Sequence, residues 1–344
     1  MHETDSIPLG VAVIGLGFMG QTHVAAYHRA ARDGLPVALV AVSDQNPERL
    51  TGLSTTAGNI NTTDSVLLFD PSSVATYTNP RDLLADERVG LVSIATHTDT
   101  HVDLAIAALR AGKHVIVEKP VAISVEAIER LIGVARESKT LCLPAMCKRF
   151  WPGWTLMLDA VRDGRYGSVI SARFERLGSP PSWAHDFYLD PSRSGGVLFD
   201  LHVHDADFIL GLLGPPESLR SFGTPSHITT AYHYPGIPGH IIAEGGWVNA
   251  PSFPFRIRFM IEFERAVADF DFAREPTLLM HSADGSHAPP LPRLTAYEAE
   301  VQHAIELALG RATTPRVSLD DALLVTRLLH AELTSLTTGK VAEF

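Results

Sequence analysis

Gly15-Leu16-Gly17-Phe18-Met19-Gly20 is a glycine-rich loop between an apolar, β-rich run and a helical pattern. The first glycine permits a tight turn, the second lets the backbone approach a pyrophosphate, and the third lets the helix pack on the strand. The amino end of the helix would then face the phosphates. The loop therefore predicts a nucleotide-binding strand–helix unit, with contacts from Gly15, Gly17, Phe18, Met19 and Gly20.

Asp44 ends the next apolar run, 24 residues after Gly20. A carboxylate at this place accepts hydrogen bonds from the ribose 2′- and 3′-hydroxyls and repels a 2′-phosphate. NAD is therefore favoured over NADP, although Arg49 lies near enough in sequence to complicate the charge argument. The alternative is a structural aspartate that starts a turn with Asn46-Pro47.

The first third of the chain alternates short strands with helices, which is typical of a parallel sheet covered on both faces. Ligands of such sheets bind outside the carboxyl ends of the strands. Strands are expected at Leu9–Gly15, Val37–Asp44, Val74–Tyr77, Leu91–Thr96, Val115–Val117 and Leu141–Met146, and helices at His23–Asp33, His101–Ala111 and Ser124–Lys139.

From Val169 onward the pattern of predicted elements changes, because longer strands separated by Pro- and Gly-rich turns replace the alternation of strands and helices. These strands are expected at Val169–Glu175, Thr229–Tyr234, Ile241–Val248, Arg256–Phe263 and Ala266–Phe272, followed by helices at Thr295–Leu309 and Leu319–Thr337. Tight turns between successive strands favour an antiparallel sheet. The fold class is therefore α/β, with one domain at residues 1–122 and a second at 123–344.

The segment Gly195–Phe208 reads as a helix that is apolar nearly all round, so polar groups on it must be satisfied or functional. Asp200, His204 and Asp207 share one helical face, and a carboxylate one turn from a histidine suits a general acid or base. One alternative is a core hydrogen bond between Asp200 and His204. Another is a metal site at His202 and His204, but these point about 200° apart on a helix, so no metal is expected.

Lys119 follows an apolar strand and lies between Glu118 and Pro120. At the carboxyl end of a parallel strand, its ammonium would point at the substrate and the nicotinamide. It could stabilise a developing alkoxide there. The alternative is a solvated lysine at a strand end.

The charge balance is acidic, with 28 Lys and Arg against 39 Asp and Glu. This argues against nucleic acid or an anionic membrane as a partner. No stretch approaches the ~20 apolar residues of a membrane span. Glu3 and Asp5 before the run Val11–Ile14 argue against a signal peptide. Cys142 and Cys147 are expected as buried thiols of a cytoplasmic protein.

Three blocks carry a resemblance to a known family: the glycine loop, AGKHVIVEKP at Ala111–Pro120, and SGGVLFDLHVHD at Ser194–Asp205. Together with the pattern around Thr338-Gly339-Lys340, they make the chain resemble the glucose–fructose oxidoreductase/inositol dehydrogenase (Gfo/Idh/MocA) family over nearly its whole length. The resemblance implies an N-terminal Rossmann domain and a C-terminal domain with an open, mainly antiparallel sheet. It also implies a homo-oligomer, a dimer or a tetramer.

The family's Lys/Asp/His catalytic set carries over onto Lys119, Asp200 and His204. The cofactor set implied by loop and resemblance is Gly15, Gly17, Phe18, Met19, Gly20, Asp44, Thr96, His97, His101, Glu118 and Lys119. The expected substrate contacts are Lys119, Arg149, Trp183, His202 and His204. Two residues depart from the family pattern. His97 stands where the family usually has a proline, and His202 stands where it commonly has a glycine.

The resemblance implies an NAD-dependent oxidoreductase acting on a sugar, a polyol or a sugar derivative. In the oxidative direction, His204 would take the hydroxyl proton while hydride leaves for the nicotinamide, and Asp200 would orient His204. Three alternatives remain open: transient oxidation by a tightly held NAD in an elimination or epimerisation, a non-catalytic nucleotide-binding regulator, and a metal-dependent hydrolase.

Overall fold

The computed structural model describes residues 7–54, 67–181, 185–188 and 190–344. The chain divides into two units. The N-terminal unit is Met1–Met146 with Leu294–Ala322, and the C-terminal unit is Cys147–Arg293 with Leu323–Phe344. A division of function at residue 122 stays a prediction.

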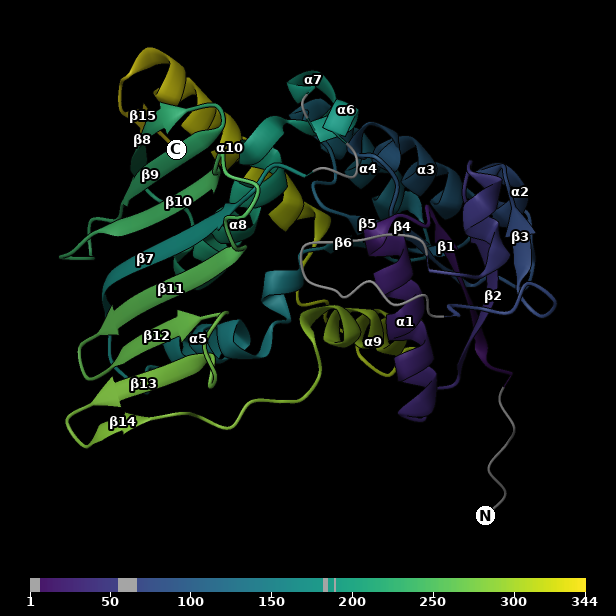
Figure 1. Ribbon diagram of the computed structural model, residues 1–344, viewed down its shortest axis with the longest axis horizontal. Helices are drawn as coiled ribbons and strands as arrows, with labels where there is room; N and C mark the ends of the chain where they lie inside the picture. Colours follow the sequence, from purple (N-terminus) through teal and green to yellow (C-terminus); the bar gives the residue numbers. More distant parts are fainter. Residues whose placement is uncertain (1–6, 55–66, 182–184, 189) are drawn as a thin grey trace. The chain divides into compact units, whose positions relative to one another are not determined.

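A six-stranded parallel sheet forms the centre of the N-terminal unit, with the strand order β3-β2-β1-β4-β5-β6 (Figure 1). Its strands are β1 (Leu9–Ile14), β2 (Val37–Ser43), β3 (Ala75–Tyr77), β4 (Leu91–Ile94), β5 (His114–Glu118) and β6 (Cys142–Ala145). All five pairings are parallel, as the sequence predicts. The order reverses between β1 and β4, which is the place where ligands bind in such sheets.

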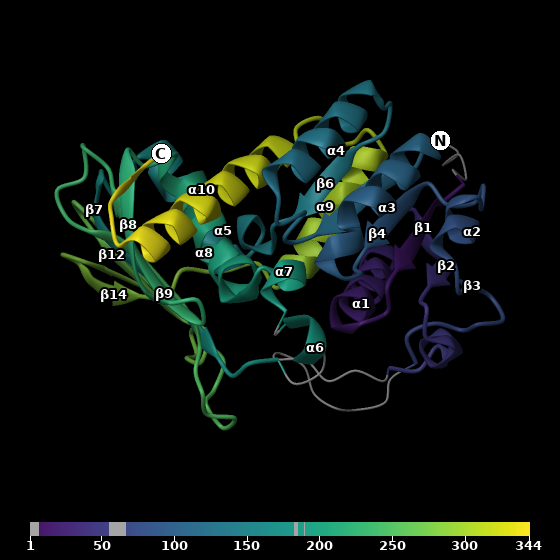
Figure 2. The ribbon, with the colours of Figure 1, turned by 90° about the horizontal axis from the view of Figure 1, so that it is seen from above.

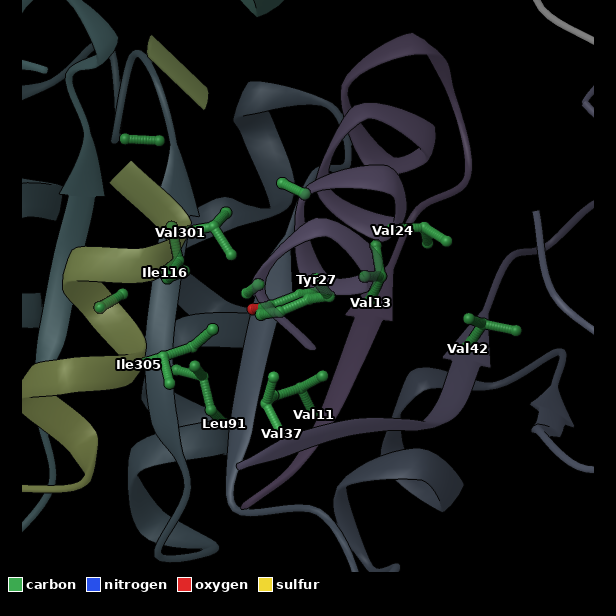
Figure 3. Packing of buried hydrophobic residues seen from close by; sticks show 14 of the residues in the cluster. Val11, Val13, Val24, Tyr27, Val37, Val42, Leu91, Ile116, Val301 and Ile305 are labelled. Atoms are coloured by element: carbon green, nitrogen blue, oxygen red, sulfur yellow. The ribbon is translucent and has the colours of Figure 1, made fainter. Parts of the chain in front are cut away.

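Helices cover both faces of this sheet (Figure 2). They are α1 (Phe18–Arg32), α2 (Pro80–Leu84), α3 (Thr98–Arg110), α4 (Val125–Glu137) and α9 (Ala296–Ala308), with a short 3₁₀ turn η1 (Pro47–Thr51). Helices α1 and α9 pack side by side on one face, where Tyr27 and Ile305 meet strand residues such as Val11 and Leu91 (Figure 3). Because α9 lies far along the sequence, the core of this unit closes only with a late segment of the chain.

The C-terminal unit is built on a nine-stranded sheet of order β14-β13-β12-β11-β7-β10-β9-β8-β15. Its strands are β7 (Val169–Gly178), β8 (Ser218–Thr224), β9 (His227–His233), β10 (Ile241–Trp247), β11 (Arg256–Phe263), β12 (Val267–Asp271), β13 (Leu278–Ser282), β14 (Gly285–His287) and β15 (Ala342–Glu343). The β7–β10 pair is parallel and the other pairs are antiparallel. The expected mainly antiparallel, open sheet is therefore confirmed.

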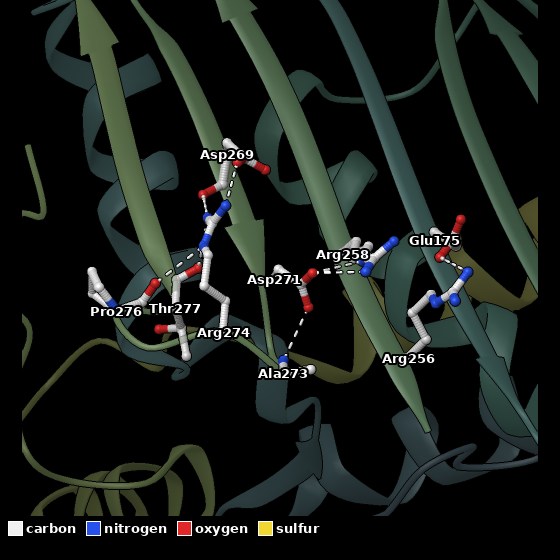
Figure 4. A network of polar contacts seen from close by, with 9 residues as sticks. All are labelled: Glu175, Arg256, Arg258, Asp269, Asp271, Ala273, Arg274, Pro276 and Thr277. Atoms are coloured by element: carbon white, nitrogen blue, oxygen red, sulfur yellow. Dashed lines mark hydrogen bonds and ion pairs between the residues drawn. The ribbon is translucent and has the colours of Figure 1, made fainter. Parts of the chain in front are cut away.

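Alternating side chains give this sheet one apolar and one polar face. On β11, Ile257 and Phe259 are buried, whereas Arg258 points outward and pairs with Asp271 of β12 at 2.8 Å (Figure 4). The buried face packs around Trp154, whose ring lies 4.9 Å from that of Phe259. This face therefore carries the core of the unit.

The helical elements of the C-terminal unit are η2 (Cys147–Arg149), α5 (Pro152–Asp163), α6 (His185–Tyr188), α7 (Pro191–Ser194), η3 (Leu198–His202), α8 (Val203–Leu213) and α10 (Leu319–Thr338), which begins in the N-terminal unit. The expected helix at Gly195–Phe208 is real, but its first part, η3, is a π-helical turn. The backbone N–H of Val203 donates to the carbonyl of Leu198, five residues earlier. Such π turns are rare and occur often at functional sites.

Candidate active site

Two of the loop glycines are required by the backbone geometry. Gly15 has φ +88°, and a Cβ on it would lie 2.6 Å from the carbonyl oxygen of Ala95. A Cβ on Gly20 would lie 1.7 Å from the carbonyl oxygen of Gly15. Both glycines thus hold the loop and the first turn of α1 against the strands, as the spacing predicts.

Gly17 has a different role, because no atom lies within 4 Å of a Cβ built there. It is the N-cap of α1, it has no side-chain cap, and the first turn, with Phe18 and Met19 half-buried, holds no acidic residue. The backbone at this helix end is therefore accessible to a phosphate group, and no side-chain charge of the turn opposes it. The loop fits the pyrophosphate of a dinucleotide.

Asp44 is buried directly after β2 and contacts the glycine loop. Its Oδ2 accepts the backbone N–H of Leu16 at 2.7 Å, and its Oδ1 accepts that of Asn46 at 2.8 Å. The guanidinium of Arg49 lies 3.3 Å from Oδ2. The carboxylate is thus fixed beside the loop, and it starts the turn at Asn46 as well.

His101 on α3 is buried and spans the ends of two strands. Its Nδ1 lies 2.9 Å from the carbonyl oxygen of Pro120, and its Nε2 lies 3.1 Å from that of Thr96. Burial lowers the pKa of His101, although both carbonyls oppose this shift. The neutral ring can donate to only one carbonyl at a time.

The two other predicted cofactor contacts of this region lie at the start of α3. Thr96 Oγ1 lies 2.7 Å from Oγ1 of Thr100, and His97 is exposed as the N-cap of α3.

Glu118 and Lys119 lie at the carboxyl end of β5. Glu118 is buried, with Oε1 3.0 Å from Nε2 of His23 and Oε2 accepting the backbone N–H of Lys119 at 3.1 Å. Burial raises the pKa of Glu118, but His23 and Lys119 outweigh it, so the net shift is downward. The side chain of Lys119 is partly exposed. Because β1, β4 and β5 are neighbours in the sheet, the glycine loop, Thr96 and Lys119 share one edge.

Asp200 and His204 stand out in the η3–α8 segment of the C-terminal unit. Between Gly196 and Leu210, a run that the structure describes in full, every other residue is buried, whereas these two are partly exposed. The Sγ atom of Cys147 lies 3.9 Å from Nδ1 of His204. The segment thus holds a partly exposed carboxylate and a partly exposed imidazole in an otherwise buried run.

The other two aspartates of this segment are held by arginines. Asp205 receives Nε and Nη2 of Arg176 at 2.8 and 2.9 Å. Asp207 receives Nε and Nη2 of Arg149 at 2.9 and 2.8 Å, and its carbonyl accepts Nη2 as well. A Cβ on Gly211 would lie 2.4 Å from this guanidinium. Arg149 therefore anchors α8 in the structure, and its expected substrate contact stays a prediction.

His202 is fully buried, with its Nε2 2.8 Å from Oε2 of Glu332 on α10. Trp183 lies outside the described residues.

No group of three or more His, Cys, Asp or Glu side chains in the described part of the chain could hold a metal ion. The two cysteines form no disulfide; Cys147 is buried in η2 as expected, whereas Cys142, at the start of β6, is only partly buried, so the expectation of a buried thiol is wrong there.

Sequence reasoning did not anticipate two residues that structure this region, His23 and Glu332. His23 falls on the expected first helix, but nothing in its pattern marks Glu118 as its partner. Glu332 is an acidic residue on the apolar face of the last helix, and that position is the one signal that could have found it.

Comparison with known proteins identifies two family models in the chain. Residues 9–145 match the model described as an oxidoreductase family with an NAD-binding Rossmann fold, and residues 154–247 match the C-terminal domain of the same family. Among solved structures, levoglucosan dehydrogenase in complex with NADH and levoglucosan has a TM-score of 0.81 at 21% identity, covering 98% of this chain and 99% of that one. At that identity the likeness concerns the fold.

Among curated proteins, the 1,5-anhydro-D-fructose reductase of Ensifer adhaerens is 35% identical over 145 residues, 41% of this chain and 44% of the relative. The myo-inositol 2-dehydrogenase of Thermotoga maritima is 28% identical over 206 residues, 59% and 54% of the two chains. The chain thus spans about half the length of the curated relatives it matches. With the parallel sheet, the glycine loop and both family models in place, the chain belongs to the Gfo/Idh/MocA oxidoreductase family.

Proposed function

We propose that this protein transfers hydride between a nicotinamide dinucleotide and a hydroxyl or carbonyl carbon of a sugar, a polyol or a sugar derivative. The observation that carries the proposal is the partial exposure of Asp200 and His204 in a segment that is otherwise buried from Gly196 to Leu210. Leaving a carboxylate and an imidazole accessible in an otherwise buried segment costs packing, and a reaction with a bound substrate explains why they are there.

Lys119, Asp200 and His204 would share the chemistry. When bound, the nicotinamide supplies the hydride acceptor or donor. In the oxidative direction His204 takes the proton of the substrate hydroxyl, and the Lys119 ammonium stabilises the negative charge that develops on the same oxygen. Asp200 orients the imidazole of His204. In the reductive direction the same groups return the proton.

NAD is the proposed cofactor in preference to NADP, because of Asp44. Its carboxylate is fixed beside the loop by the backbone N–H of Leu16. An anion at the end of the second strand accepts ribose hydroxyls and repels a 2′-phosphate. Arg49, 3.3 Å away, already pairs with this carboxylate and neutralises part of its charge, so the discrimination rests on geometry as well as on charge.

The substrate class follows from the relatives named above. Their names include a myo-inositol 2-dehydrogenase, a levoglucosan dehydrogenase and a 1,5-anhydro-D-fructose reductase. Each of these substrates is a cyclic polyol or an anhydro sugar. A ring hydroxyl of such a compound is therefore the proposed reacting group.

A substrate panel tests the proposal. The purified protein is incubated with NAD and myo-inositol, levoglucosan, aldoses and open-chain polyols, and with NADH and keto sugars, while the nicotinamide absorbance is followed. Turnover with at least one compound that is abolished in His204→Gln supports the proposal. Conversion of substrate without net NADH release would identify transient oxidation instead, and conversion of none of the compounds would refute the substrate class.

Two further expectations stay predictions. We expect a homo-oligomer in the cytoplasm, and size-exclusion chromatography with light scattering measures the number of subunits. Among the described residues, each helix is too short or too polar to cross a membrane.

A further inference from the structure

His202 occupies the last position of the π-helical turn η3, between Asp200 and His204 in the sequence. Its side chain is completely buried, and Nε2 lies 2.8 Å from Oε2 of Glu332, which is also completely buried. The phenol oxygen of Tyr232 lies 3.3 Å from the same nitrogen. The imidazole therefore contacts α10 and β9 simultaneously.

Glu332 is surrounded by donors. Its Oε1 accepts the hydroxyl of Tyr232 at 2.7 Å, and its Oε2 accepts Oγ1 of Thr230 at 3.2 Å in addition to His202. Thr230 Oγ1 lies 2.8 Å from Oγ of Ser221 on β8. A buried carboxylate with three partners is favourable only while all of them stay in place, so this network fixes η3 relative to the sheet.

Close packing against β10, as well as the contact with Glu332, holds the His202 side chain in place. A Cβ on Gly245 of β10 would lie 2.9 Å from Nδ1 and 3.0 Å from Cβ of His202. The ring therefore packs directly against the backbone of β10, and a side chain at position 245 would displace it. Its Nδ1 has no hydrogen-bond partner among the described residues. The hydrogen bonding of the ring is thus concentrated on Nε2.

The charges around His202 favour its protonated form. Burial opposes protonation, but attraction to Glu332 outweighs burial and raises the pKa of His202. Asp205 on α8 acts in the same direction, and Arg176 on β7 acts against it. Burial and Glu332 both raise the pKa of Tyr232, so this phenol remains a neutral donor. The contact between His202 and Glu332 thus ties the π turn to α10.

We propose that the His202–Glu332 pair is a positioning device, which holds the π turn so that Asp200 and His204 keep the orientation that hydride transfer requires. The proposal rests on the function proposed above, and it reassigns His202 from substrate contact to positioning. π turns are rare and occur mostly as single turns inside α-helices, often at functional sites. The single π turn at Leu198–His202 is held from outside by the contact between His202 and Glu332. The partly exposed Asp200 and His204 lie two positions before and two positions after the buried His202 in the sequence.

Glu332→Gln and His202→Gln, singly and together, test the pair in the full-length protein. Each single substitution is expected to lower kcat about tenfold while the KM for NAD stays within about twofold, because the anchor orients reacting groups without touching the cofactor. The double variant is expected to match the singles, since both break one interaction. Glu244→Gln is the matched control, because Glu244 pairs with His227 at 2.8 Å on the same sheet in a more exposed position.

Two readouts do not depend on turnover. Hydrogen exchange of peptides from residues 198–213 is expected to rise in Glu332→Gln and to stay unchanged in the control and in peptides of the N-terminal unit. By NMR, the pKa of His202 is expected to fall in Glu332→Gln. Unchanged exchange in 198–213 overturns the proposal, as does an unchanged kcat in an active enzyme. If the wild type converts no substrate, the proposed function fails, whereas exchange and NMR still decide whether the pair holds the turn.

Discussion

Nε2 of His23 lies 3.0 Å from Oε1 of Glu118, and this buried contact joins the helix that begins in the glycine loop to the strand that ends before Lys119. The Nδ1 of His23 lies 2.9 Å from Oγ of Ser93 on β4, which lies between β1 and β5 in the sheet. The other oxygen of Glu118 accepts the backbone N–H of Lys119. A buried chain of polar contacts therefore joins α1, β4 and β5 and ends at the backbone N–H of the candidate catalytic lysine.

Glu118→Gln should lower the free energy of unfolding at pH 7 by about 1–3 kcal/mol, because a charge-assisted buried contact is weakened. The pKa of Glu118 is lowered in the folded protein, so its stabilisation is present above the unfolded pKa, about 4.3, and is lost as pH falls through the folded pKa. Urea unfolding at a series of pH values measures this. The acid slope should flatten in the variant, whereas the exposed control Glu87→Gln should keep it; equal slopes in all three proteins would contradict the assignment.

Gly17 and Gly20 make a matched pair of substitutions. Gly17→Ala has open space and φ −67°, so the protein should fold with wild-type stability but bind NADH at least about tenfold more weakly, since the methyl group enters the phosphate position. Gly20→Ala places a Cβ 1.7 Å from the carbonyl oxygen of Gly15 and should cost about 3 kcal/mol or more. Thermal unfolding and NADH fluorescence titration separate the two effects. Tight NADH binding by Gly17→Ala would exclude the loop as the pyrophosphate site.

The parallel half of the fold was predictable because its signals are local. Strands such as Leu9–Ile14 are continuous apolar runs, and the backbone of the glycine loop requires glycine at Gly15 and Gly20. The mainly antiparallel arrangement of the second sheet was predictable, but its complete set of strands was not. Strand β8 (Ser218–Thr224) was missed, since only Leu219 and Ser221 in it are buried and no apolar run marks it.

The candidate site was predictable in residue type but not in partners. The sequence places Asp200, His204 and Asp207 on one helical face, yet only the first two are partly exposed, because Arg149 binds Asp207. Ion pairs between residues 58 positions apart leave no local pattern. The same holds for His202, whose partner Glu332 lies on the last long helix.

Asp44→Ser should shift cofactor preference towards NADPH by about tenfold or more, because it removes the anion that opposes a 2′-phosphate and leaves Arg49 to attract it. Parallel fluorescence titrations with NADH and NADPH measure the ratio. Adding Arg49→Gln to the first substitution should cancel most of the gain in NADPH affinity. Tighter binding of NADPH than of NADH by the wild type would contradict the role given to Asp44.

Lys148→Met should raise the free energy of unfolding at pH 7 by about 1 kcal/mol or more, since a buried amine is replaced by an apolar chain of similar length. The Nζ of Lys148 lies 3.4 Å from the ring centroid of Trp151 and has no hydrogen-bond partner among the described residues. Burial, with Arg176 adding to it, lowers the pKa of Lys148 well below its usual value.

Because the folded protein binds this proton more weakly than the unfolded chain, wild-type stability should rise with pH from the folded pKa of Lys148 to about 10.4. Chemical denaturation between neutral and alkaline pH measures that rise, and Lys148→Met should lack it. The exposed control Lys139→Met should retain the rise. A loss of stability in Lys148→Met would show that the ammonium over Trp151 stabilises the fold.

Lys119→Met and His204→Gln should each lower kcat by about 10²–10⁴-fold on a confirmed substrate, because each removes a group that acts on the reacting oxygen in the transition state. NADH affinity should stay within about twofold in His204→Gln, whose site lies in the C-terminal unit. If the two groups act on one substrate oxygen, the double variant should be far less impaired than the product of the two single losses. Strict multiplication of the losses would mean that they act in separate steps. Full turnover in either single variant would remove that residue from the mechanism.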